Sequence, residues 1–264
     1  MELFNELRMT QAKHLNMRIP LAGKKLLEIG CGDGFLLKHI ADCYEVESII
    51  GIDPFLLEWY GIGGDNWSIR DGNVEQLCFE DNIFDTVISY STFEHIGDIV
   101  KALSEIKRVL KPYGKFYTEF APIWTSITGH HFTAQGDWTW NPEHLKLIPP
   151  WGHLYMDRTE MKEHLMREKV EPVLEAQILH YIYESEIINR LSRVDLTDAI
   201  FGSGMIIRFY REFVKFDRLS FTAPDKRENE LTEDIINRIK ESGYMLEDIG
   251  VSGIAFCLEK YDKL

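Results

Sequence analysis

A short apolar run that ends in three alternating glycines is the feature that most constrains the fold of this chain. Residues 26–37 read LLEIGCGDGFLL, with Gly30, Gly32 and Gly34 between two apolar stretches. Glycine accepts positive φ and leaves no Cβ between the backbone and a ligand. A helix that begins after such a turn directs its free N–H groups toward whatever lies on the turn. The pattern therefore predicts the first strand, turn and helix of a nucleotide-type site in an open α/β sheet.

The side chains around this turn indicate which kind of nucleotide it takes. A dinucleotide fingerprint has Gly or Ala where this chain has Phe35, which is too bulky for close helix–strand packing. Glu28 precedes the glycines and Asp33 lies among them. Two carboxylates would repel a pyrophosphate and attract a cationic amino group. The stretch resembles motif I of the class I S-adenosylmethionine-dependent methyltransferases, and an ordinary glycine turn without a ligand is the simpler alternative.

Later segments extend this resemblance, in the order that the family has them. A second buried strand ends in Asp53, about 20 residues after the glycines, where an acid can reach ribose hydroxyls. Residues 72–79 (GNVEQLCF) resemble the family's segment beside adenine, with Asn73 where Asp is usual. Residues 84–96 (FDTVISYSTFEHI) resemble the fourth strand and its following turn, and residues 111–117 (KPYGKFY) resemble the start of the fifth strand.

The resemblance implies a fold, a cofactor and the residues that hold it. The implied fold is α/β, with a doubly wound, mostly parallel, seven-stranded, Rossmann-like sheet. The implied cofactor is S-adenosyl-L-methionine, and the product is S-adenosyl-L-homocysteine. The residues at the family's methionine, ribose and adenine positions are Glu28, Gly30, Cys31, Gly32, Asp33, Gly34, Asp53, Pro54, Asn73, Val74, Glu75 and Ser89.

The rest of the chain continues the alternation of strands and helices that a doubly wound sheet requires. A helix is expected over residues 1–18, covering the cofactor site. Further elements are expected as helices over 193–200 and 231–242 and as strands over 205–213 and 253–260. The expected organisation is a helix and cofactor-binding half over 1–120, an inserted substrate lid over 121–188, and completion of the same sheet over 189–264.

Residues 121–188 are too long for an ordinary connection, so we expect them to be functional and to cover the acceptor. Aromatic and histidine residues gather there, and an aromatic surface suits the flat face of a ring or sugar. Residues 129–132 (GHHF) and 150–154 (PWGHL) resemble a pattern of methyltransferases associated with surface glycan biosynthesis. The expected substrate contacts are Trp124, Trp138, Trp140, Trp151 and His153, although Trp138 and Trp140 would equally suit the core of a small subdomain.

Three histidines are the catalytic candidates. His130 and His131 follow the fifth strand, and in an extended segment adjacent side chains point in opposite directions, so that one would face the methyl group. His95 lies in the turn that faces the reaction site in the family pattern. We expect a histidine to act as general base for an acceptor hydroxyl, while each could instead be packed or on the surface. The histidine spacing matches no defined metal site, so no metal is predicted.

Composition limits the partners and the compartment. A formal net charge of −14 argues against a nucleic-acid partner, because phosphate binding needs a basic face. No apolar run has the length of a membrane span, and residues 1–18 lack the apolar core of a signal peptide. Four cysteines show neither disulfide nor metal spacing, which fits a reducing cytoplasm. We therefore expect a cytoplasmic protein with a small-molecule or sugar-type acceptor, and we allow for a homodimer.

Two other classes of function stay open at this point. A nucleotide-dependent oxidoreductase is disfavoured by Phe35 and by the later segments. A non-catalytic S-adenosylmethionine-binding or interaction protein of the same fold would keep the glycines and Asp53. Calorimetry with S-adenosylhomocysteine and, separately, with NAD would discriminate these classes.

Overall fold

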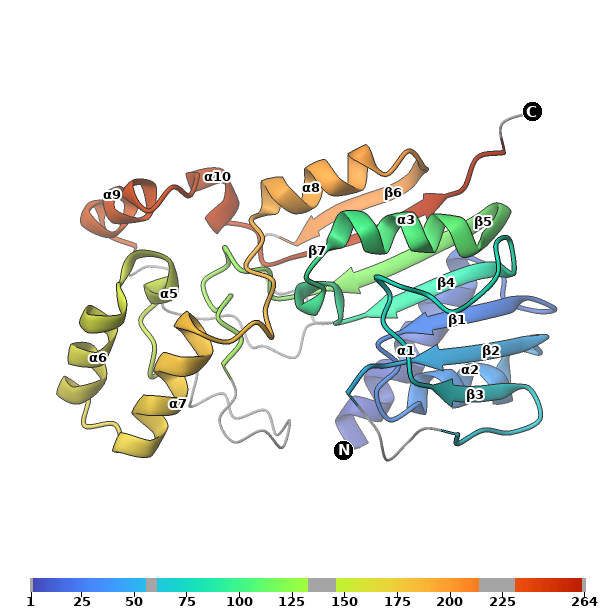
Figure 1. Ribbon diagram of the computed structural model, residues 1–264, viewed down its shortest axis with the longest axis horizontal. Coiled ribbons are helices and arrows are strands. Elements are labelled where there is room, and N and C mark those ends of the chain that lie inside the picture. The colour runs from blue at the N-terminus through green and yellow to red at the C-terminus, as the bar shows by residue number, and fades with distance from the viewer. Residues whose placement is uncertain (1, 56–60, 133–145, 214–230, 263–264) are drawn as a thin grey trace. The chain divides into compact units, whose positions relative to one another are not determined.

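Seven strands form one sheet in the order β3-β2-β1-β4-β5-β7-β6 in the computed structural model, which describes residues 2–55, 61–132, 146–213 and 231–262 (Figure 1). The strands are β1 (Lys25–Ile29), β2 (Ser48–Ile52), β3 (Trp67–Arg70), β4 (Phe84–Tyr90), β5 (Leu110–Phe120), β6 (Ile206–Phe213) and β7 (Gly253–Glu259). The pairs β3–β2, β2–β1, β1–β4 and β4–β5 are parallel. The predicted α/β class and the mostly parallel seven-stranded sheet are confirmed.

The strand order reverses direction between β1 and β4, and this position determines where a ligand can bind. In open α/β sheets, ligands bind at the carboxyl ends of the strands on either side of such a reversal. The glycine turn follows β1, and the turn η2 (Phe93–His95) follows β4. The glycine turn and η2, which each resemble a methyltransferase motif, therefore both lie at the reversal point.

The helices are distributed along the whole chain. They are α1 (Glu2–Arg18), α2 (Phe35–Cys43), α3 (Ile99–Val109), α5 (Gly152–Tyr155), α6 (Arg158–Arg167), α7 (Pro172–Tyr183), α8 (Arg193–Gly202), α9 (Glu233–Glu241) and α10 (Leu246–Ile249). The sequence explains where α3 begins, because Asp98 caps it by accepting a hydrogen bond from the Lys101 backbone N–H. Within the described ranges, no helix combines the length and apolarity that a membrane crossing requires.

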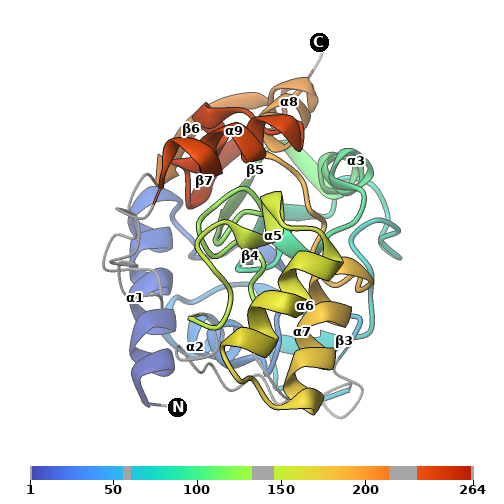
Figure 2. The ribbon, with the colours of Figure 1, turned by 90° about the vertical axis from the view of Figure 1, so that its left-hand side faces the viewer.

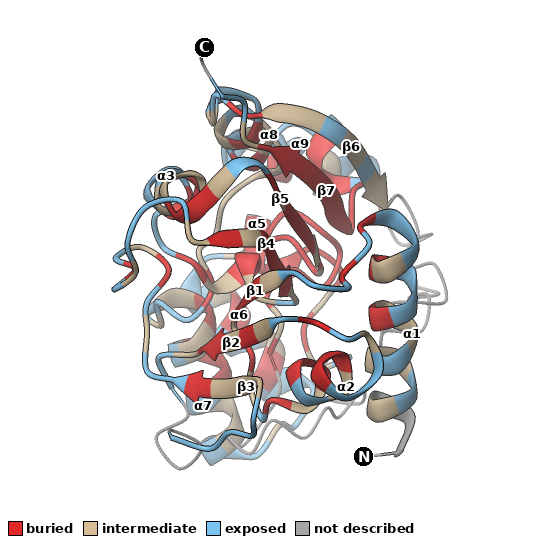
Figure 3. Ribbon diagram, turned by 90° about the vertical axis from the view of Figure 1, so that its right-hand side faces the viewer, coloured by how far each residue is buried: buried red, intermediate tan, exposed pale blue. Residues whose placement is uncertain are grey.

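The chain divides into two compact units. The first contains residues 1–120, 198–211 and 255–264, and the second contains residues 121–197 and 212–254. In the first unit, α1 and α2 contribute to a core with one face of the sheet, through residues such as Leu15, Leu37 and Ile88. Strand β7 is buried throughout its length, and β1 and β4 are mostly buried, whereas β6 is only half-buried (Figure 3).

The second unit has an apolar core of its own. Helices α5, α6 and α7 surround it (Figure 2), and Trp124, Trp151 and Met161 are among its buried residues. Ile239 of α9 and Ile249 of α10 belong to the same core. The unit therefore extends beyond the expected insertion of 121–188 and takes in part of the stretch expected to complete the sheet. The role of residues 121–188 as a lid stays a prediction.

Candidate functional site

The glycine turn after β1 combines two glycines fixed by packing with one that faces open space. All three have positive φ, +71° at Gly30, +54° at Gly32 and +71° at Gly34. A Cβ on Gly30 would overlap the Thr92 side chain, and one on Gly34 would overlap Ile69. A Cβ on Gly32 would meet no described atom within 4 Å. The fold thus requires Gly30 and Gly34, whereas Gly32 leaves room for a ligand.

Asp53 and Asp33 lie beside this turn with their carboxylates already oriented. Asp53 accepts hydrogen bonds from the Gly32 N–H at 3.2 Å and the Phe55 N–H at 3.0 Å. Asp33 accepts from the Phe35 N–H at 3.1 Å and forms an ion pair with Arg8 at 2.6 Å. Because Arg8 belongs to α1, the N-terminal helix contacts the glycine turn, as the sequence led us to expect.

Glu28 brings a third carboxyl group to the turn, from inside β1. Its side chain is 3% exposed, and its Oε2 atom has no hydrogen-bond partner among the described residues. Burial raises the pKa of this carboxyl from 4.5 to about 8. A buried carboxyl without a partner fits a ligand that brings a cationic group to this position.

The other predicted cofactor residues are held in different ways. The Asn73 side-chain oxygen accepts from the Glu75 N–H at 2.8 Å, and the Glu75 carboxylate accepts from the Asp98 N–H at 3.0 Å. Val74 is buried and Pro54 is exposed. Ser89 is buried in β4, and its hydroxyl has no partner in the described part of the chain. Cys31 is buried, and burial raises the pKa of its thiol.

The turn after β4 contains two residues, Thr92 and Glu94, that were not among the predicted site residues. Thr92 fills the space beside Gly30, and its hydroxyl donates to the Tyr90 carbonyl at 3.0 Å. Glu94 is 2% exposed, and neither of its carboxylate oxygens has a partner among the residues described. Burial raises the pKa of Glu94 to about 8. The neighbouring candidate His95 is half-buried. An acid next to His95 in the motif was the available sequence signal for Glu94.

His130 and His131 lie in the second unit, in a conformation that differs from the expected one. His130 is 1% exposed, and its Nδ1 atom accepts from the Phe132 N–H at 3.0 Å. His131 has φ +50°, and its N–H donates to the Thr128 carbonyl at 2.9 Å. The segment is therefore a tight turn, so the extended geometry on which the opposite-facing argument depended is wrong. The catalytic role of either residue stays a prediction.

The described tryptophans of the second unit are buried in its core. The Trp124 indole N–H donates to the Tyr244 hydroxyl at 2.9 Å, and the Trp151 indole N–H donates to the Ile249 carbonyl at 3.3 Å. These bonds give both residues a structural role, and their contact with a substrate stays a prediction. Trp138 and Trp140 lie outside the described residues.

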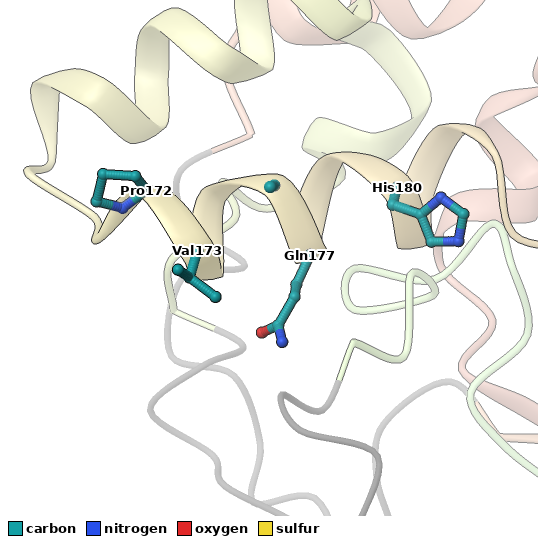
Figure 4. Close-up of a pocket in the computed structure, with 5 residues that line it drawn as sticks. Pro172, Val173, Gln177 and His180 are labelled. Atoms are coloured by element: carbon teal, nitrogen blue, oxygen red, sulfur yellow. The ribbon is translucent and has the colours of Figure 1, made fainter.

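One surface hollow lies apart from all the predicted site residues. Five α7 residues line this hollow of about 530 Å³: Pro172, Val173, Ala176, Gln177 and His180 (Figure 4). Val173 and Gln177 project from the same side of the helix. The hollow carries none of the chemistry that the glycine turn offers.

Comparison with known proteins agrees with the geometry of the first unit. Residues 27–118 match the methyltransferase domain family, from β1 to β5. This match supports the class I S-adenosylmethionine-dependent methyltransferase family for residues 27–118. The family that the sequence motifs indicated is thereby confirmed over this segment, and S-adenosylmethionine is the cofactor of that family.

Individual methyltransferase relatives cover only part of this chain. The ubiquinone biosynthesis O-methyltransferase of Xanthomonas oryzae is 29% identical over 154 residues, which are 54% of this chain and 60% of that protein. The tRNA U34 carboxymethyltransferase of Methylococcus capsulatus is 32% identical over 108 residues, 38% of this chain and 33% of that protein. The chain thus spans about a third to three fifths of the length of these relatives.

A solved structure extends the likeness in fold to almost the whole chain. The S-adenosylmethionine-dependent methyltransferase from Mesorhizobium loti has a TM-score of 0.54 and 16% sequence identity, covering 94% of this chain and 96% of that one. At this identity the likeness concerns the fold alone.

Proposed function

We propose that this methyltransferase transfers a methyl group from S-adenosylmethionine to a hydroxyl group of a small molecule or sugar-type acceptor. The observation that carries the proposal is the glycine turn, where Gly32 faces open space and its N–H donates to Asp53, a carboxyl that also interacts electrostatically with the buried Glu28. A dinucleotide would bring a pyrophosphate next to these carboxyls, whereas the methionine part of S-adenosylmethionine brings a cationic amino group.

Each part of the cofactor has a matching group in the first unit. Glu28 would hold the cationic amino end, because its buried Oε2 atom has no partner in the described residues. Asp53 would accept from the ribose hydroxyls, since two backbone N–H groups orient its carboxylate beside the glycine turn. Residues 73–75 would border the adenine. When bound, the cofactor supplies a methyl group that is already electrophilic.

The remaining task of the protein is to place the acceptor oxygen in line with that methyl group and to exclude water. A histidine would accept the hydroxyl proton as the new bond forms, and His95, His130 and His131 are the candidates from the sequence. The O-methyltransferase among the relatives supports an oxygen acceptor. One relative acts on tRNA, but the net charge of −14 favours a small acceptor over a nucleic acid here.

Calorimetry with S-adenosylhomocysteine tests the cofactor assignment directly. The parent protein should bind S-adenosylhomocysteine and should not bind NAD. Asp53→Asn should weaken that binding roughly 10-fold to 100-fold, since a hydrogen bond to a charged group contributes about 1.5–3 kcal/mol. Asp42→Asn is the matched control, because Asp42 is an exposed acid of α2 that is paired with Lys38. Binding of NAD alone, or equal affinity in both variants, would contradict the proposal.

A further inference from the structure

The chain that leaves β5 folds into a coil with an unusual set of buried hydroxyl groups. The N–H of Ser126 donates to the Ile123 carbonyl, and the N–H of Gly129 donates to the Ser126 carbonyl, each at 3.0 Å, so the coil consists of successive tight turns. Thr125, Ser126 and Thr128 are all buried. None of their side-chain oxygens has a hydrogen-bond partner within the described ranges. Buried hydroxyls without partners are costly and uncommon, so three in four residues require an explanation.

His153 of α5 lies against the same coil and has a fixed proton arrangement. Its Nε2 atom lies 2.7 Å from the Trp124 carbonyl oxygen. A carbonyl oxygen can only accept, so Nε2 must carry a proton. Burial lowers the pKa of His153 from 6.5 to about 4, which keeps the ring neutral at pH 7. The other nitrogen, Nδ1, is therefore a bare lone pair, and it has no partner among the described residues although the side chain is only 5% exposed.

The contacts around His153 are mostly uncharged, and the nearby cation Arg190 lies over the Trp124 ring, 5.5 Å from its centroid. The Trp151 N–H donates to the Ile127 carbonyl at 3.1 Å and joins the start of α5 to the coil. The rings of Trp124 and His130 meet that of His153 edge to face, with centroids 4.7 Å and 5.2 Å away. The coil from 123 to 132 and α5 contain no Asp, Glu, Lys or Arg.

We propose that the coil of residues 123–132 and His153 form the acceptor subsite, which takes an uncharged, hydroxyl-bearing ligand whose hydroxyl donates to Nδ1 of His153. This inference rests on the proposed methyltransferase function. A hydroxyl both donates and accepts, so the hydroxyls of such a ligand suit the bare lone pair of His153 as well as the hydroxyls of Thr125, Ser126 and Thr128. An ionised carboxylate only accepts hydrogen bonds, so it could not donate to the Nδ1 lone pair of His153.

Nitrogen NMR of the full chain labelled with ¹⁵N-histidine tests the subsite. The probe is methyl α-D-glucopyranoside at millimolar concentration, with S-adenosylhomocysteine present, and glucose 6-phosphate is its charged counterpart. Without the sugar, the His153 spectrum should show a proton on Nε2 and none on Nδ1. The neutral glycoside should shift the Nδ1 resonance, and the phosphate should not. A proton on Nδ1, or an Nδ1 resonance that the glycoside leaves unmoved, would overturn the proposal.

Two pairs of variants separate ligand recognition from folding. His153→Gln keeps an amide N–H at the Nε2 position and removes the Nδ1 lone pair, whereas His153→Asn does the reverse. His153→Gln should keep its thermal stability and lose the glycoside response. Thr128→Val should weaken glycoside binding roughly tenfold, while Thr118→Val, which makes the same change in β5, should not. If Thr128→Val and Thr118→Val bind the glycoside equally, the proposal fails.

The outcome for the acceptor subsite is distinguishable from that for the proposed function. Calorimetry with S-adenosylhomocysteine reports only on the first-unit site. Cofactor binding together with an absent glycoside response would reject the acceptor subsite and leave the methyltransferase assignment intact. Absent cofactor binding would reject the proposed function itself, and the acceptor subsite with it.

Discussion

Alanine in place of Gly32 should separate ligand binding from folding, because the two glycines of the turn differ in what a Cβ would meet. At Gly32 the only cost to the folded chain is a non-glycine residue at φ +54°, about 1–2 kcal/mol. Reduced freedom of the unfolded chain offsets about 0.4–1 kcal/mol of that. The net loss of about 1 kcal/mol corresponds to a fall in Tm of about 2–4 °C. At Gly30 the same backbone cost applies, and overlap with Thr92 adds about 1–3 kcal/mol.

Gly30→Ala should lose more stability, whereas Gly32→Ala should lose more affinity for S-adenosylhomocysteine. Gly32→Ala places a methyl group in the space where no described atom lies within 4 Å, so affinity should fall roughly tenfold or more, and Gly32→Val should abolish binding. Gly23→Ala is the matched control, because Gly23 also has positive φ (+67°) and open space around its Cβ. Thermal melts and calorimetry of the three alanine variants provide the measurements. If Gly32→Ala binds S-adenosylhomocysteine as tightly as Gly23→Ala, the turn is not the cofactor site.

Two further predictions concern protonation and exchange. Glu94 keeps its proton up to about pH 8 in the folded protein but loses it near pH 4.5 in the unfolded chain. Its burial therefore lowers the free energy of unfolding increasingly as the pH rises between these values. Glu94→Gln should make the free energy of unfolding fall less steeply with pH, by up to about 1.4 kcal/mol per pH unit between about pH 5 and pH 8. If urea titrations show the free energy of unfolding falling equally steeply with pH in the variant and the parent, this prediction is wrong. Hydrogen exchange in 146–188 should slow when S-adenosylhomocysteine and the glycoside are both present, as for a lid that closes on its ligands, whereas equal protection with and without them would indicate a rigid subdomain.

The local pattern of the sequence was enough to predict the first unit. Its strands are short apolar runs bounded by glycines and acids, and its helices follow within a few residues, so periodicity and turn chemistry indicate each element separately. Residues 26–37 predicted the end of β1, the turn and the start of α2. The sheet order then follows from the resemblance, because β1 and β4 carry motifs that adjoin the same cofactor.

The second unit depends on contacts that no local pattern shows. Its core joins Trp151 to Ile249, almost a hundred positions further along the chain, and the insertion therefore could not be delimited from composition. The positive φ of His131 is equally silent in the sequence, since a non-glycine residue seldom adopts it. The proton on Nε2 of His153 could be inferred only from the Trp124 carbonyl oxygen. That carbonyl lies far from His153 in the sequence but within hydrogen-bond distance in the fold.

The buried carboxyls of Glu28 and Glu94 in the first unit have a common physical explanation. Glu28 lies in β1 and Glu94 follows β4, and these strands are neighbours at the reversal point of the sheet. Burial without a partner disfavours the charged form of both, so the ligand-free protein carries them largely protonated at neutral pH. A cationic ligand in the turn would favour the charged carboxylate of Glu28 and lower its pKa. A cationic ligand would thus offset the unfavourable free energy of burying Glu28 without a partner. A neutral or anionic nucleotide would not offset it.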